Sequence, residues 1–187
     1  GSDNTLIGDS AGGALTTGAN NVAVGSAALD AVTDVSYLTA IGEKALSANT
    51  SGTKNTAVGR AALQSITTVS NNTAVGYNSL SGGSNAAAGN TAVGTETLEA
   101  NTTGANNVAV GLSALTANTT GANNAAVGKD ALAANTTGSS NSALGEVALT
   151  TNTTGAENVA IGANALRYNT TGDKNAALGN KALQANT

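Results

Sequence analysis

The chain has 187 residues and a formal net charge of -4, and it contains no Cys, His, Met, Trp, Phe or Pro. Without Cys and His it lacks disulfides, thiolate nucleophiles and the commonest metal ligands, which excludes most enzyme and metal-site classes. Its seven Lys and Arg residues form no basic stripe, and no apolar run is long enough to span a membrane. We therefore expect no enzyme, no cofactor, no nucleic-acid partner and no membrane insertion by this segment.

One short repeat fills the chain. An aliphatic residue is followed by glycine eleven times, and nine of the ten gaps between these glycines are 17 residues long, the tenth being 18. A unit this short cannot bury a core alone and must stack on its neighbours. We therefore predict an all-β fold over residues 1–187, a parallel β-solenoid of eleven coils of about 17 residues. The predicted structural glycines are Gly8, Gly25, Gly42, Gly59, Gly76, Gly94, Gly111, Gly128, Gly145, Gly162 and Gly179.

Both ends of the chain fall inside repeats. Gly1 is in register with Gly138, and the end at Thr187 stops midway through the Asn-Thr-Thr-Gly part of the repeat. We expect this single repeat domain to be a segment of a longer fibre protein.

The residues before each glycine predict a strand. With the glycine as position 0, positions -4 to -1 alternate with period two, as in Asn107-Val108-Ala109-Val110. We expect positions -1 and -3 to point into the coil, and Ala at -2 to lie on the opposite face. Ala on an outward face in ten of the eleven copies suggests close packing against another copy of the chain. The predicted oligomer seam is Ala23, Ala40, Ala57, Ala74, Ala92, Ala109, Ala126, Ala143, Ala160 and Ala177.

The residues after each glycine predict the rest of the coil. We expect the glycine to turn the chain through a positive φ or a close backbone approach. Positions +2 to +4, often Ser-Ala-Leu, predict a second short strand or extended corner, with Leu115 and its equivalents in the core. Asn-Thr-Thr-Gly then closes the coil, and the Asn at -4 predicts a stacked amide ladder. Irregular copies occur at Val32-Thr33-Asp34-Val35, at Ile66-Thr67-Thr68-Val69 and near Gly82-Gly83-Ser84.

Position +1 follows no residue rule and, with position +2, carries many of the charges, which predicts a solvated outer face. Tyr77 and Leu112 occupy this position and are candidate receptor-contact residues, because an exposed Tyr can anchor a partner. The alternative is that they are incidental surface residues.

The Asn-Thr-Thr turns allow two further interpretations. They match the N-glycosylation sequon, but glycans on coils about 4.8 Å apart would collide, so turn chemistry is favoured. Stacked Thr at +8 and +9 would also form a flat hydroxyl-and-methyl array of the kind that ice-binding solenoids present.

The repeats resemble the head repeats of trimeric autotransporter adhesins, the YadA-like family. Asn21-Val22-Ala23-Val24-Gly25, Asn107-Val108-Ala109-Val110-Gly111 and Asn158-Val159-Ala160-Ile161-Gly162 are most similar to the family motif. The 17-residue form is also similar to repeats of phage tail fibres. The resemblance implies a left-handed β-roll, a side-by-side homotrimer, and an extracellular location on a cell surface or virion fibre.

The leading hypothesis is a structural and attachment module of an extracellular fibre, either a surface adhesin head or a phage or injection-system tail-fibre shaft. Its partners would be copies of itself and a host or cell-surface receptor. The competing hypothesis is a monomeric β-solenoid that binds ice or another flat surface.

Overall fold

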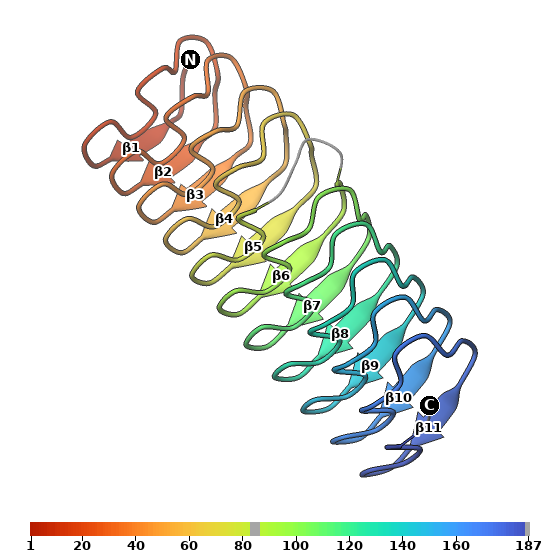
Figure 1. Ribbon diagram of the computed structural model, residues 1–187. Coiled ribbons are helices and arrows are strands. Elements are labelled where there is room, and N and C mark those ends of the chain that lie inside the picture. The colour runs from red at the N-terminus through yellow and green to blue at the C-terminus, as the bar shows by residue number, and fades with distance from the viewer. Residues whose placement is uncertain (83–86, 186–187) are drawn as a thin grey trace.

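The computed structural model describes residues 1–82 and 87–185, which form a β-solenoid (Figure 1). Eleven three-residue strands stack in chain order into one parallel sheet. Each strand residue pairs with its equivalent in the next coil, as Ala109 does with Ala126. The strands are β1 (Thr5–Ile7), β2 (Val22–Val24), β3 (Thr39–Ile41), β4 (Thr56–Val58), β5 (Thr73–Val75), β6 (Thr91–Val93), β7 (Val108–Val110), β8 (Ala125–Val127), β9 (Ser142–Leu144), β10 (Val159–Ile161) and β11 (Ala176–Leu178). The predicted parallel solenoid with about 17 residues per coil is confirmed.

The repeat glycines are required by both of the effects that the sequence suggested. Their φ angles lie between 121° and 138°, a region that residues with a side chain rarely adopt. The backbones of adjacent coils also meet there: a Cβ on Gly111 would lie 2.6 Å from the carbonyl oxygen of Gly128. From Gly8 to Gly162, any other residue at position 0 would therefore push two coils apart.

The leucines at position +4 fill the centre of the coil, as expected. Leu115 and the +4 leucines from Leu29 to Leu166 are buried, together with Ala114 and the +3 alanines from Ala28 to Ala165, whereas Leu183 in the last coil is 51% exposed. The predicted second strand, however, is wrong. Ser113 and Leu115 have φ angles of 54° and 53°, so the backbone here is a compact turn with left-handed residues at +2 and +4. An extended chain would send positions +3 and +4 to opposite faces, whereas this turn buries both.

A ladder of buried asparagines at -4 joins successive coils, confirming the predicted amide ladder. The Oδ1 of Asn107 accepts a hydrogen bond from the backbone N–H of Asn124 at 2.9 Å, and its Nδ2 donates to the carbonyl of Gly121 at 2.9 Å. These bonds satisfy polar groups that have no access to water, which would otherwise be costly.

A second ladder runs through the asparagines at +7. Asn135 donates from Nδ2 to the Oδ1 of Asn118 and to the carbonyl of Gly138, both at 2.9 Å. Its own Oδ1 accepts from Asn152 at 2.9 Å. The turn asparagines from Asn101 to Asn169 therefore form a continuous column, which the sequence reasoning treated only as turn residues.

Three copies have an aliphatic side chain in place of this asparagine, at Leu15, Val32 and Ile66. Val32 and Ile66 stand at +7, and both are buried. Because Ile66 has no amide to donate, the Oδ1 of Asn49 in the preceding coil is buried without a hydrogen-bond partner. The irregular copy near Gly82-Gly83-Ser84 falls largely outside the described residues.

Two glycine variants separate backbone strain from the contact between coils. We expect Gly111→Ala to lower the free energy of unfolding by at least about 3 kcal/mol, because strain and overpacking add. Gly179→Ala should cost only about 1 kcal/mol. Gly179 has a similar φ of 121°, but no atom lies within 4 Å of its would-be Cβ. Urea unfolding followed by circular dichroism measures both, and equal losses would contradict the close approach of the coils.

The second ladder predicts a large effect of Asn135→Ala. The substitution removes the donor to Asn118 and Gly138 and the acceptor for Asn152, so we expect a loss of about 2–5 kcal/mol in the free energy of unfolding. Thr137→Ala, two residues along the same turn and exposed, is the matched control and should change stability by less than about 0.5 kcal/mol. Thermal or urea unfolding compares the two variants.

Candidate functional site

The strand faces are the reverse of the sequence prediction. Ala109 is fully buried, whereas Val108 beside it is 41% exposed. The whole set predicted as an outward seam lies inside the coil, at most 4% exposed: Ala23, Ala40, Ala57, Ala74, Ala92, Ala109, Ala126, Ala143, Ala160 and Ala177. The seam assignment is therefore corrected. These alanines share one core with the leucines at +4, and a coil this thin leaves room for only a methyl group opposite them.

The face that points outward has an aliphatic column along its whole length. We call it the outward sheet face, meaning the side chains at -1 and -3 of β1 to β11. Position -1 is aliphatic in every coil: Ile7, Val24, Ile41, Val58, Val75, Val93, Val110, Val127, Leu144, Ile161 and Leu178. Position -3 carries Thr5, Val22, Thr39, Thr56, Thr73, Thr91, Val108, Ala125, Ser142, Val159 and Ala176. A contiguous exposed aliphatic column of this kind is typical of an interaction surface.

The side chains at +1 form a second exposed column, the variable column, which stacks residues 17 positions apart. Its members are Asp9, Ser26, Glu43, Arg60, Tyr77, Thr95, Leu112, Lys129, Glu146, Ala163 and Asn180. The two candidate receptor-contact residues, Tyr77 and Leu112, are 43% and 46% exposed. They lie two coils apart, so the structure does not bring them into one contact.

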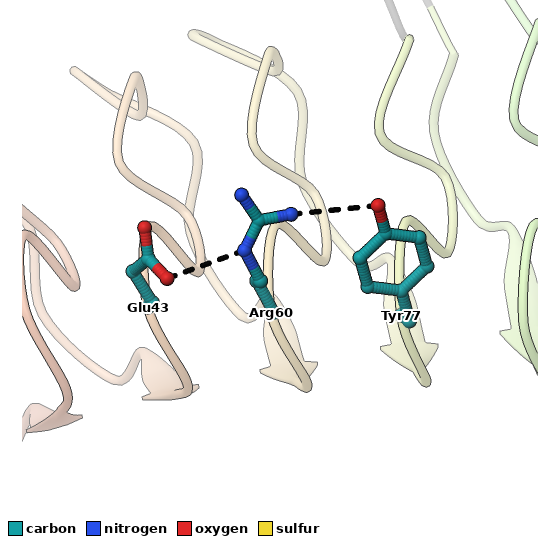
Figure 2. Close-up of polar contacts among 3 residues, drawn as sticks. All are labelled: Glu43, Arg60 and Tyr77. Atoms are coloured by element: carbon teal, nitrogen blue, oxygen red, sulfur yellow. Dashed lines mark hydrogen bonds and ion pairs between the residues drawn. The ribbon is translucent and has the colours of Figure 1, made fainter.

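Tyr77 belongs to a network across three successive coils (Figure 2). Arg60 donates from Nε to the Oε2 of Glu43 at 3.2 Å and from Nη1 to the Oη of Tyr77 at 3.5 Å. The guanidinium carbon also lies 5.6 Å from the centroid of the Tyr77 ring, within reach of a cation–π contact. The sequence reasoning missed this cluster, although aligning the copies on their glycines places the three residues in adjacent coils.

The turns present few free polar groups. Asn101 and Asn118, like the other asparagines of the Asn-Thr-Thr and Asn-Thr-Ser triplets, are buried, and their Nδ2 atoms donate to the turn carbonyls. Asn71, in a different triplet, is exposed. At +8 the hydroxyl of Thr119 donates to the carbonyl of Thr136 in the next coil at 3.0 Å. This arrangement supports turn chemistry at +8, whereas the Thr side chains at +9, such as Thr120 and Thr137, are exposed.

Several other kinds of site are not found in the described coils. Residues 1–82 and 87–185 contain no group of three or more His, Cys, Asp or Glu side chains placed to hold a metal ion. No pocket is present along this part of the rod, and its described residues form no helix long and apolar enough to cross a membrane.

No family model matches the chain, and no curated protein or solved structure is significantly similar to it.

The corrected strand faces predict different outcomes for two neighbouring glutamates. Ala126→Glu would place a charge in the core and should prevent folding or cost several kcal/mol, because Ala126 is fully buried. Val127→Glu points outward from a side chain that is already 37% exposed and should retain the β-sheet circular dichroism spectrum. A folded Ala126→Glu protein with an unfolded Val127→Glu protein would restore the original assignment.

Proposed function

We propose that the chain is a structural and attachment module of an extracellular fibre, in which copies of the rod associate side by side through the outward sheet face. One observation carries this proposal. An aliphatic residue occupies position -1 in all eleven coils and faces away from the chain's own core. Burial of apolar surface is the main driving force for association. An unbroken aliphatic column would let every coil of a fibre subunit contribute to a lateral contact.

The dimensions of this face are in keeping with a lateral contact. Strands about 4.8 Å apart make an eleven-strand face roughly 50 Å long. A typical stable interface buries about 800 Å² per partner. A trimer, in which every chain meets two others, increases the area that each chain buries.

The number three and the left-handed coil rest on the resemblance to adhesin head repeats. Stacking of identical coils gives a stiff rod whose stability grows with the number of repeats. The variable column, with Tyr77 and Leu112, is left to contact a receptor, and several chains in a fibre would present it several times over.

One observation favours the alternative of a monomeric ice-binding or other flat-surface-binding solenoid. Thr39, Thr56, Thr73 and Thr91 stack in consecutive strands of the outward sheet face, beside the aliphatic column. These residues form a Thr column on the sheet, in addition to the exposed Thr residues at +9 of the turns. Ice-recrystallisation inhibition by the wild-type monomer would favour this alternative.

Oligomeric state tests the proposal directly. Sedimentation velocity at micromolar concentration should give a trimer for the wild type. Val127→Glu should shift the mass toward the monomer, because the charge would have to be desolvated in the contact. Leu112→Glu, at the exposed +1 position, is the matched control and should remain trimeric. A wild type that is monomeric throughout this concentration range would refute the assembly.

A further inference from the structure

We propose that Glu43, Arg60 and Tyr77 form a shallow binding site for a neutral carbohydrate. The site lies on the variable column and does not depend on lateral assembly. Two ion pairs occur among the described side chains: Lys129 with Asp130 joins neighbours in one coil at 3.8 Å, whereas Arg60 with Glu43 joins two coils. Tyr77 extends the second pair to a third coil.

The network fixes the orientation of its functional groups. The guanidinium of Arg60 is held by Glu43 on one side and Tyr77 on the other, which limits the rotamers that a long exposed side chain would otherwise sample. In Figure 2 the remaining terminal nitrogen of Arg60 and the second carboxylate oxygen of Glu43 extend away from the two bonds. The cluster therefore presents a free donor, a free acceptor and an aromatic ring side by side.

These three groups match the chemistry of a sugar. Each sugar hydroxyl both donates and accepts hydrogen bonds, so adjacent hydroxyls can bond to a guanidinium N–H and a carboxylate oxygen together. The C–H face of the sugar ring can pack on the aromatic ring of Tyr77, which is 43% exposed. The charges of Glu43 and Arg60 cancel within the pair, which favours a neutral sugar over an acidic one.

The shape of the surface indicates a linear ligand. No pocket encloses the cluster in the described coils, so one sugar would be held weakly. The column continues with hydroxyl-bearing residues, Ser26 before Glu43 and Thr95 after Tyr77, at a spacing of about 4.8 Å per coil. An oligosaccharide lying along the rod axis could contact several coils at once.

The chain supplies its own internal control. Tyr168 is 46% exposed and lies against Arg167, with the guanidinium carbon 5.2 Å from the ring centroid. Arg167 donates from Nη1 to the Oδ1 of Asn164, so this pair lacks the carboxylate. A ligand that needs only an aromatic ring and a cation would bind both sites, whereas the proposed sugar distinguishes them.

The three tyrosines make the test specific. With 13C-labelled Tyr rings, NMR resolves Tyr37, Tyr77 and Tyr168, each assigned by a Tyr→Phe variant. We would titrate the wild-type chain with neutral linear hexasaccharides (cello-, malto- and laminarihexaose) and with an acidic heparin hexasaccharide. We expect the Tyr77 ring signals to shift with at least one neutral sugar, and the Tyr168 signals to stay in place.

Two variants test the polar groups. Glu43→Gln and Arg60→Gln alter side chains that are about half exposed, so both proteins should fold, as circular dichroism can verify. Each should weaken binding about tenfold, while Arg167→Gln should not. The proposal is overturned if no neutral sugar shifts Tyr77, if only the acidic sugar does, or if Tyr168 shifts equally. We expect the same sugar binding whether the chain is a monomer or a trimer, so the sedimentation experiment and the sugar titration test separate proposals.

Discussion

The stack depends on the contact between successive glycines at position 0, where the backbones of adjacent coils approach until no Cβ fits between them. This contact fixes the axial register of every coil against the next. Once the glycines are aligned, Ala at -2, Leu at +4 and the two asparagines at -4 and +7 each lie on their own copy in the next coil. A narrow core of methyl and isobutyl groups can then be close-packed without any aromatic side chain.

The asparagine ladders show how the same register handles polar groups. A buried amide is costly when it stands alone, but in the column from Asn101 to Asn169 each asparagine after the first donates to the side chain of the preceding one. Where Ile66 stands in place of the asparagine, the Oδ1 of Asn49 has no partner. Replacing the asparagine at +7 by an aliphatic residue therefore leaves the amide oxygen of the asparagine in the preceding coil without a hydrogen bond. The hydrogen bonds of each asparagine in the column therefore depend on asparagines at the same position in the adjacent coils.

Much of the architecture could be predicted from the sequence, because a 17-residue period leaves few alternatives to a stacked coil. The glycines, the core leucines and the ladder at -4 follow from which positions do not vary. Which face of the strand is buried could not be predicted from the sequence. The alternation in Val108-Ala109-Val110 separates two faces but does not show which one lies inside the coil. Larger apolar residues are usually buried, and here the thin coil inverts that rule. The left-handed backbone at +2 and +4 was equally hidden, because Ser113 and Leu115 are not residues that normally indicate it.

The constancy of position -1 has a consequence for alignment between molecules. If one outward sheet face slides along another by a single coil, the aliphatic side chains at -1 again meet aliphatic side chains, so this column contains almost no information about height along the rod. The variable column does contain that information, because its chemistry changes from coil to coil. Glu43 marks the third coil, Arg60 the fourth and Tyr77 the fifth. The molecule therefore has one uniform column, at position -1, and one column, at position +1, whose residues distinguish one coil from another.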